Sequence, residues 1–373
     1  MGKSKRTVSV TIVTYHSEPF AVRCLESIFA QDWPSLEVVV VDNNSRDRTP
    51  EILSAYQGRA RIILNKENRG FAAAQNQAIR RAGGDWVLVL NPDVVLAPDF
   101  ISTLVQGGMM DPDIGTVCGK LYRALPNLDI PPSPRLDSAG IYFTPTFRHL
   151  DRGMHEQDRE DYSRPAFVFG ATAAAALYRR SMIEDVSVDG EFFDEDFYLY
   201  REDADLSWRA QLLGWRCLYL PQAVGYHVRR VFPGCRRSLP AGINRHSVKN
   251  RFLMRMKNTT WPLYLRNFLP VTARDLGILF YCLVAEQSSL GAFAAVLRIW
   301  KRTWAKRRLI QQRRRVSDAN LRKWFRFRPV TEPVTLPLRP HEEPVLVRAP
   351  AGRSAALPVP AARQRGGLSQ LQP

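Results

Sequence analysis

Several features that would place this chain in a familiar class are scarce or missing. Its 373 residues contain only five cysteines, none of them in a CxxC pair. This number and spacing favour a reducing compartment over a disulfide framework or a cysteine-bound zinc ion. No stretch reaches the roughly 18 uninterrupted apolar residues that a membrane-spanning helix needs. The basic residues 1–6 lead straight into a strand-like segment, so we expect no signal peptide.

Two common nucleotide-binding motifs are also absent. No GxGxxG follows the first apolar run, and neither GxxxxGKS nor GxxxxGKT occurs in the sequence. These absences argue against a dinucleotide-dependent dehydrogenase and against a P-loop enzyme. A nucleotide can instead be held by Asp42, which would accept hydrogen bonds from its base or ribose. A divalent cation on Asp93 can neutralise a diphosphate, because hard cations prefer carboxylate oxygens.

The charge of the chain is large and unevenly distributed. The 53 Lys and Arg residues exceed the 36 Asp and Glu residues, which gives a formal charge of +17. Such a charge fits three partners: nucleic acid, an anionic membrane surface or a phosphate-rich substrate. Residues 229–328 hold 24 basic and three acidic residues, a net +21, so the remainder of the chain sums to −4. A mildly acidic module is therefore followed by a strongly basic one.

Apolar runs typical of strands alternate with helical patterns over the first hundred residues. Strands are expected at residues 8–14, 37–41, 61–64 and 86–90, and helices at 20–31, from 49 onward and at 71–82. The second helix has Thr49 as its expected N-cap and Pro50 at its first helical position. This alternation predicts an α/β fold with a mostly parallel, doubly wound sheet flanked by helices.

Polar clusters follow each of these strands. They comprise residues 14–17, 42–45, 65–70 and 91–93. Any one cluster is also explained as an ordinary turn, since Asn, Asp, Gly and Pro favour turns. In doubly wound sheets, however, ligands bind at the carboxyl ends of the strands. Four clusters at the same edge therefore favour a binding site.

The middle of the chain contains a second acidic cluster. Residues 123–165 lack periodicity and are expected to form a long insertion or an acceptor-side loop. Residues 166–178 return to a strand-like pattern, and residues 203–213 have a helical one. Glu202 and Asp203 would then lie at a helix N-terminus, where the helix dipole stabilises carboxylates.

Two interpretations of these carboxylates remain open. Asp203 or Asp205 can serve as a helix cap. Alternatively, acids between Phe- and Tyr-rich stretches suggest carboxylates beside an apolar pocket, where one acts as a general base. His227 follows an expected short strand at 217–220 and is either a metal or phosphate ligand or a hydrogen-bonded loop residue.

Five motifs in a fixed order carry a resemblance to a known family. They are Val10–Tyr15, Val40–Ser45, Asn68–Phe71 with Asn76, Leu90–Asp93, and Tyr200–Leu206. Together they resemble the inverting family-2 glycosyltransferases with the GT-A fold, over about residues 7–230. The resemblance implies that a sugar is transferred from a nucleotide diphosphate donor.

The resemblance also implies a role for each matching residue. The donor-binding residues would be Thr14, Tyr15, Asp42, Asn43, Arg69, Gly70, Asn76 and Asn91. Asp93 and His227 would hold Mg²⁺ or Mn²⁺. Asp203 would be the catalytic base, with Glu202 and Asp205 as supporting acids.

The expected metal motif departs from the family at one position. Asn91 replaces the first Asp of the DxD motif, so the site has one anionic ligand fewer. Asn-Pro-Asp at 91–93 resembles the rhamnosyltransferase-like branch, which often uses dTDP-rhamnose. The implied mechanism is a single displacement in which Asp203 takes a proton from an acceptor hydroxyl and the anomeric configuration inverts. A UDP- or GDP-hexose is the alternative donor.

The basic module contains short apolar runs between its charges. Over residues 240–328 these runs are about ten residues long, too short to span a bilayer as helices. The pattern predicts basic amphipathic helices on an anionic membrane surface, with an ordinary helical cap on the catalytic domain as the alternative. The expected divisions are thus a GT-A domain at 1–239, a membrane-associating region at 240–328 and a disordered tail at 329–373.

The resemblance extends to acceptor and location. Many relatives act on polyprenyl-diphosphate-linked sugars, so the expected acceptor is a glycan or such a lipid-linked saccharide in cell-surface polysaccharide synthesis. The expected location is cytoplasmic, peripheral on the inner face of the plasma membrane. Two more distant alternatives are a sugar nucleotidyltransferase, whose Gly-rich phosphate loop is missing, and a nucleic-acid-binding protein. The latter leaves the acidic motifs unexplained, so no nucleic acid partner is expected.

Overall fold

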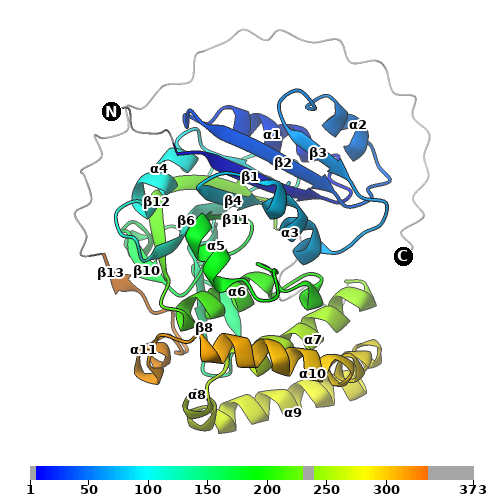
Figure 1. The fold of residues 1–373 in the computed structure, drawn as a ribbon, viewed down its shortest axis with the longest axis vertical. Coiled ribbons are helices and arrows are strands. Elements are labelled where there is room, and N and C mark those ends of the chain that lie inside the picture. Colours follow the sequence, from blue (N-terminus) through cyan, green and yellow to red (C-terminus); the bar gives the residue numbers. More distant parts are fainter. Residues whose placement is uncertain (1–5, 230–238, 335–373) are drawn as a thin grey trace. The chain divides into compact units, whose positions relative to one another are not determined.

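The N-terminal part of the chain alternates strands and helices, as expected (Figure 1). The structure, a computed structural model, describes residues 6–229 and 239–334. This part consists of β1 (Val8–Thr14), α1 (Ala21–Phe29), β2 (Leu36–Asp42), α2 (Thr49–Ser54), β3 (Arg61–Leu64), α3 (Phe71–Arg81), β4 (Trp86–Leu90), β5 (Val94–Leu96) and α4 (Phe100–Gly108). The four expected strands are confirmed, because runs of buried β-branched residues favour extended backbone.

These strands belong to one large sheet. Its order is β13-β10-β12-β6-β11-β4-β1-β2-β3, with β6 (Ile114–Arg123), β10 (Ala166–Val168), β11 (Ala175–Arg179), β12 (Arg216–His227) and β13 (Glu332–Pro333). Strands β4, β1, β2 and β3 are parallel neighbours, as are β6 and β12, whereas β11 runs antiparallel between β4 and β6. The long strands other than β11 thus share one direction, which confirms the mostly parallel α/β fold.

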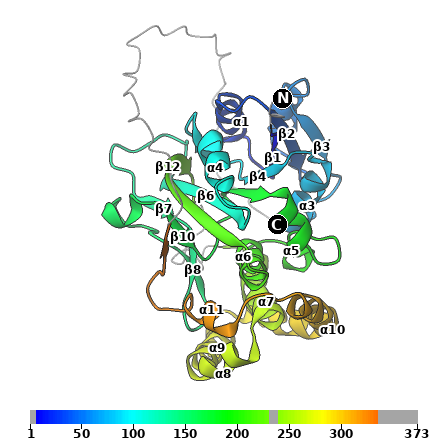
Figure 2. The same ribbon diagram turned by 60° about the vertical axis from the view of Figure 1, so that its left-hand side comes forward.

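Helices cover both faces of the sheet (Figures 1 and 2). On one face, α1, α2 and α4 share a core with Leu88 and Leu90 of β4. On the other face, α3, α5 (Arg180–Val186) and α6 (Glu202–Leu212) share a core with Val87 and Val89. Successive strand residues point to opposite faces, so an uninterrupted apolar strand can serve two cores at once.

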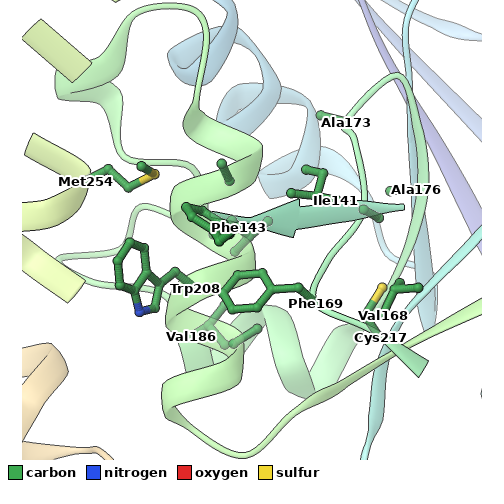
Figure 3. Packing of buried hydrophobic residues seen from close by; sticks show 14 of the residues in the cluster. Ile141, Phe143, Val168, Phe169, Ala173, Ala176, Val186, Trp208, Cys217 and Met254 are labelled. Atoms are coloured by element: carbon green, nitrogen blue, oxygen red, sulfur yellow. The ribbon is translucent and has the colours of Figure 1, made fainter. Parts of the chain in front are cut away.

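The expected insertion at 123–165 contains short strands instead of a plain loop. β7 (Leu136–Ser138) pairs with β6, and β8 (Ile141–Phe143) forms a hairpin with β9 (His149–Asp151). Phe143 packs against Trp208 of α6 and Phe325, with ring centroids 5.0 and 5.6 Å apart. Figure 3 shows this buried cluster extending to Met254 of α7 (Ala241–Asn258). Hydrophobic packing therefore fixes the insertion against α6.

The start of α2 differs by one residue from the prediction. The helix begins at Thr49 with Arg48 as its N-cap, and the Asp47 carboxylate accepts a hydrogen bond from the Thr49 amide at 3.1 Å. The Thr49 hydroxyl accepts instead from the Ser17 amide at 2.9 Å. The predicted N-cap role of Thr49 is wrong, because the neighbouring aspartate supplies the acceptor.

The cap interpretation of the acidic cluster is also wrong. Helix α6 begins at Glu202 after Arg201, which has left-handed backbone angles, and no side chain caps it. Asp203 and Asp205 both lie within its first turn. The expected strand at 217–220 is likewise part of the longer β12, which continues through an irregularity to His227. His227 is therefore a strand residue.

The basic segment is helical. After α7 come α8 (Trp261–Arg266), α9 (Phe268–Val284), α10 (Gly291–Gln312) and α11 (Asp318–Arg322). α7 packs against both α6 and α10, and the described residues group as one compact unit. Of the helices in the described ranges, none combines the length and apolarity needed to cross a bilayer. The expected tail at 329–373 differs at its start, because Glu332–Pro333 pairs with β10. Residues 335–373 lie outside the described residues.

Buried ion pairs fasten these helices to the α/β part. Lys306 of α10 contacts Asp194 at 2.6 Å and Asp196 at 2.9 Å. Lys257 of α7 contacts Asp205 of α6 at 2.9 Å and also pairs with Asp194. The side chains of the two lysines are only 1% and 2% exposed. Part of the basic charge is therefore neutralised by acids of the preceding module.

Candidate functional site

A polar group lies at the carboxyl ends of β1 and β2. Thr14 and Asp42 are register partners there, and the Thr14 hydroxyl donates to the Asp42 carboxylate at 2.8 Å. The amide and hydroxyl of Ser45 donate to the same carboxylate at 2.9 and 2.6 Å. Asp42 is buried by these contacts. Its orientation is thus fixed at the edge of the sheet where a nucleotide is expected.

Asn43 joins two loops at this edge. Its side-chain amide donates to the Asn68 side chain at 2.8 Å and to the Gly70 carbonyl at 3.1 Å, and its oxygen accepts from the Arg69 amide. Gly70 has a φ of 80°, and a Cβ there would collide with Tyr198. A glycine is required at this position for both reasons. The expected donor loop is therefore rigidly shaped, with the Arg69 residue exposed beside it.

Two other expected donor-binding residues, Tyr15 and Asn76, differ in their exposure. The Tyr15 ring is 45% exposed and packs edge-on against His16. Asn76 is buried, and its amide exchanges hydrogen bonds of 2.7 and 2.9 Å with the backbone of Phe193. The structure therefore brings Tyr15 to the surface near the donor loop and engages Asn76 in holding residues 193–195.

A pocket of about 560 Å³ brings together most of the expected reactive residues. Its lining includes Asn91, Asp93, Glu202, Asp203 and His227. These residues come from the end of β4, the start of α6 and the end of β12. Segments far apart in the sequence meet because their strands end at the same edge of the sheet.

Asp93 and His227 lie next to each other in this pocket. The His227 Nε2 atom is 3.4 Å from an Asp93 carboxylate oxygen, and its Nδ1 atom is 2.7 Å from Asp137. Burial lowers the pKa of His227, but the two carboxylates outweigh it and raise the pKa to about 9. The Asp137 contact orients the imidazole so that Nε2 faces Asp93.

Asp137, Asp151 and Arg229 form a network that the sequence analysis missed. Arg229 contacts Asp137 at 2.7 Å and Asp151 at 2.8 Å. Burial raises the pKa of Asp137, but His227 and Arg229 outweigh it and hold the pKa well below its usual range. Both aspartates lie in the 123–165 segment, where neither periodicity nor a motif marks them. Only the contacts that Asp137 of β7 and Asp151 of β9 make with His227 and Arg229 reveal their role.

The carboxylate of Asp203 is held by two backbone amides. One oxygen accepts from the Ala204 amide at 2.7 Å and the other from the Ala173 amide at 3.4 Å. Burial and the nearby Asp151 raise the pKa of Asp203 to about 6, against the lowering effect of the amides. The residue is only partly buried. A pocket-facing carboxylate that ionises near neutral pH is suited to general base catalysis.

Glu202 has a different environment from its neighbour. It is 7% exposed, and its Oε2 atom has no hydrogen-bond partner among the described residues. Burial and the adjacent Asp203 raise the pKa of Glu202 to about 8. The two carboxyl groups titrate as an interacting pair, in which Glu202 keeps the proton more readily.

Asp205 lies outside the pocket, although the sequence placed it among the supporting acids. Its carboxylate accepts from Arg209 at 3.1 Å, from Lys257 at 2.9 Å and from Asn258 at 2.7 Å. Asp205 is fully buried. Its structural role is to tie α6 to α7.

The segment that precedes α6 is held by α7. The Asn250 amide nitrogen donates to the carbonyls of Phe197, Leu199 and Tyr200 at 2.8–2.9 Å. Tyr198, Tyr200 and Arg201 all have positive φ angles. Backbone in this strained region persists only where surrounding contacts hold it. The basic module therefore contributes directly to the position of Asp203.

The residues present are compatible with a divalent cation but do not form a complete cage. Among the described residues, no group of three or more His, Cys, Asp or Glu side chains is arranged to hold a metal ion. Asp93 offers carboxylate oxygens, and His227 offers an imidazole that is oriented by Asp137. Such a carboxylate behind a ligating histidine is common in metal sites. Mg²⁺ and similar ions typically take their remaining ligands from substrate phosphates and water.

The fold and the pocket together define a glycosyltransferase of the GT-A type. The chain belongs to Glycosyl transferase family 2, whose family model matches residues 9–187. It is 30% identical over 239 residues to an N-acetylglucosaminyl-diphospho-decaprenol L-rhamnosyltransferase of Mycobacterium tuberculosis, covering 58% of this chain and 75% of the relative. It is also 28% identical over 232 residues to the succinoglycan biosynthesis protein ExoO of Rhizobium meliloti, covering 60% and 61%.

Solved structures agree on the fold. GalNAc-T7, solved with UDP, GalNAc and Mn²⁺, gives a TM-score of 0.54 at 15% identity, covering 68% of this chain and 48% of that one. S. aureus TarS gives a TM-score of 0.50 at 17% identity, covering 85% and 54%. The family and the fold expected from the five motifs are thus confirmed.

Proposed function

We propose that this chain is an inverting glycosyltransferase that moves a sugar from a nucleotide diphosphate to a hydroxyl of a glycan or lipid-linked saccharide. The proposal rests on one observation. The partly exposed Asp203 shares a pocket with Asn91, Asp93 and His227 at the carboxyl edge of the sheet. Family membership supplies the reaction class, and the pocket supplies a base beside a place for the leaving group.

The proposed reaction is a single displacement. Asp203 accepts the proton of the acceptor hydroxyl, and the hydroxyl oxygen forms a bond to the anomeric carbon. The bond from that carbon to the donor phosphate oxygen breaks, and its electron pair stays on the nucleoside diphosphate. Attack from the face opposite the leaving group inverts the anomeric configuration.

The donor is proposed to lie along the polar edge from Asp42 to Asp93. Asp42, held by Thr14 and Ser45, would accept from the base or ribose. Asp93 and His227 would hold Mg²⁺ or Mn²⁺, and the bound ion would supply positive charge for the diphosphate. Tyr15, Asn43, Arg69, Gly70 and Asn76 remain predicted donor-site residues, with Asn43 and Gly70 shaping the loop.

The preferred donor is proposed to be dTDP-rhamnose, in the synthesis of a cell-surface polysaccharide. This choice rests on Asn91-Pro92-Asp93 and on the 30% identity to a rhamnosyltransferase. The test is to measure melting of the purified chain, with Mg²⁺, against dTDP-, UDP- and GDP-sugars. We expect the largest increase in melting temperature with dTDP-rhamnose. A larger increase with a UDP- or GDP-hexose would overturn the choice of donor, and no response to any of them would count against the proposed activity.

A membrane surface is the second proposed partner. Large apolar side chains are exposed along one side of α9 and on α8 and α10; they include Trp261, Leu265, Leu269, Leu276, Phe280, Leu283, Leu297 and Trp300. Those on α9 recur at intervals of three, four or seven residues, as on one helix face. Residues 261–312 contain only two acids, Asp275 and Glu286. Such a surface suits peripheral binding to anionic lipid on the inner face of the plasma membrane.

Deleting the basic module would be a poor test of this partner, because α7 holds the segment before Asp203. Surface substitutions avoid that problem. We expect Leu269→Ser with Phe280→Ser to weaken binding to phosphatidylglycerol vesicles in a flotation assay, since both side chains are more than 60% exposed. Leu64→Ser on β3, 57% exposed, is the matched control. Vesicle binding that is equal in all three proteins would argue for the helical-cap alternative.

A further inference from the structure

The pocket that contains Asp203 has a second wall with the opposite charge. Besides its carboxylates, the lining includes Arg148, Arg201, Arg229 and Arg274. Arg148 lies in the connection between β8 and β9, and Arg274 lies on α9. Neither comes from the strand ends that carry Thr14, Asp42 or Asp93. Arg148 and Arg274 therefore line the part of the pocket built by the insertion and the C-terminal helices.

The four arginines differ in their partners. Arg229 is neutralised by Asp137 and Asp151. Arg201 donates to the Ser247 carbonyl at 3.1 Å and lies 3.1 Å from the His149 ring. Within residues 6–229 and 239–334, neither Arg148 nor Arg274 forms an ion pair with a carboxylate, and Arg274 Nε is buried without a hydrogen-bond partner. Two guanidinium groups thus reach the pocket without an ion-pair partner among the described residues.

The surroundings of these two arginines add to the positive charge. Arg251 and Arg255 share the single carboxylate of Asp275, at 3.0 and 2.7 Å. Burial lowers the pKa of Arg274, and Arg148 and Arg255 lower it further against the opposing effect of Asp275. Burial and Arg201, together with Arg148, also hold the pKa of His149 well below its usual value. Arg148, Arg251 and Arg255 thus all lie close enough to Arg274 to interact with it electrostatically, and Asp275 is the carboxylate that Arg251 and Arg255 share.

Resting on the proposed function, we infer that Arg148 and Arg274 bind a phosphate or diphosphate group carried by the acceptor. Guanidinium groups bind phosphate oxygens through paired, charge-assisted hydrogen bonds. An anion at this wall would compensate the excess charge and would share the pocket with the base. The donor diphosphate is not the expected occupant, because its proposed ligands Asp93 and His227 come from strand ends, whereas Arg148 and Arg274 come from the insertion and α9.

Pyrophosphate titration tests the site without requiring turnover. The full chain is saturated with thymidine or uridine diphosphate, and inorganic pyrophosphate is then titrated by calorimetry. We expect Arg148→Gln with Arg274→Gln to weaken pyrophosphate binding at least tenfold, as for loss of hydrogen bonds to a charged group. Arg81→Gln, on the exposed end of α3, is the control and should leave it unchanged. Nucleoside diphosphate binding should change less than twofold in both.

Two further arms separate the possible sources of phosphate. In transfer assays, a sugar linked to an alkyl diphosphate should be preferred to the neutral alkyl glycoside, and the double variant should lose that preference. Binding to phosphatidylglycerol vesicles should be unaffected, since the arginines line a pocket. Loss of vesicle binding with retained pyrophosphate binding would overturn the inference in favour of lipid headgroups. Weakened nucleoside diphosphate binding would overturn it in favour of the donor.

Failure of the proposed function would look different from failure of this site. If no nucleotide sugar is used, the pyrophosphate titration still decides whether the arginines bind phosphate. If transfer occurs but the double variant keeps both pyrophosphate binding and acceptor preference, only the site is wrong. Should the double variant fail to fold, Arg148→Gln alone decides, because the Arg148 guanidinium makes no ion pair with the described carboxylates.

Discussion

Charged groups are buried both in the pocket and at the interface of α7 and α10 with the α/β part. They are paired at the interface but incompletely paired in the pocket. At the interface, Lys257 and Lys306 are almost fully buried and each meets two or more carboxylates. In the pocket, Glu202 and Asp203 lie side by side, and one Glu202 oxygen has no hydrogen-bond partner among the described residues. Paired charges hold elements together. Incompletely compensated carboxyl groups have raised pKa values and remain available for chemistry.

The same comparison explains the uneven charge of the sequence. Part of the +21 of residues 229–328 serves to neutralise acids of the first module, such as Asp194 and Asp205. Another part, including Arg274, lines the pocket. Other basic residues of the described helices, such as Lys301 and Arg308 of α10, are exposed. A charge difference between two sequence segments can therefore arise from ion pairs between them as well as from binding to external partners.

The largest effect is expected where the pocket supplies chemistry. Asp203→Asn should lower transfer by about 10²–10⁴-fold, because the amide cannot accept the acceptor proton. Donor binding, measured by calorimetry, should remain nearly intact. Asp113→Asn, an exposed acid, is the control. Near-normal turnover in Asp203→Asn would assign the base elsewhere.

A large loss of stability is expected where the interface is broken. Lys257→Met leaves Asp194 and Asp205 buried with fewer partners, which should cost about 3–5 kcal/mol in the free energy of unfolding. Urea denaturation measures this. Lys301→Met, at an exposed position of α10, should change the free energy of unfolding by no more than about 0.5 kcal/mol. Equal losses in both variants would mean that the buried pairs do not hold the helices.

A smaller effect is expected for the residue behind the proposed metal ligand. Asp137→Asn should weaken Mn²⁺ binding about 10–100-fold, because His227 loses the carboxylate that orients it. Calorimetry with a nucleoside diphosphate present gives the affinity. Asp158→Asn, in the same insertion but paired with Lys120, should leave it unchanged. Unchanged Mn²⁺ affinity in Asp137→Asn would argue against His227 as a ligand.

The pH dependence is expected to be the most gradual effect. Asp203 must be ionised to accept a proton, and its pKa is raised to about 6. As pH falls below that value the base is protonated, so kcat/KM should fall about tenfold per pH unit. Rates measured from pH 4.5 to 8 test this. If kcat/KM does not change over that range, the rate does not depend on the ionisation of Asp203.

The strands and their polar ends were predictable because their causes are local. A run such as Val38–Val41 can hardly be other than a buried strand, and parallel strands bring Asp42 and Asp93 to one edge. The order of the five motifs was enough for the family. Thr49 was misplaced as the N-cap because Arg48 takes that position, and Asp47, two residues earlier, accepts the hydrogen bond from the Thr49 amide.

The partners of the proposed active-site residues were not predictable in this way. Asp137 is 90 residues from His227, and Asn250 is about 50 residues from the backbone it holds. No periodicity or motif marks such contacts, because they depend on which elements pack together. For the same reason Asp205 was placed among the active-site acids, although its carboxylate contacts Lys257 of α7 and does not line the pocket.

The sequence by itself determined the family, the alternating α/β frame and the presence of a strongly basic module, since these depend on residue type, order and short-range spacing. Tertiary structure decided which charges are paired. Lys257 and Lys306 face carboxylates at an interface, whereas Arg148 and Arg274 face a pocket. In the sequence all four are simply basic residues. Burial and the distance to the nearest carboxylate, which only folding sets, give them different roles.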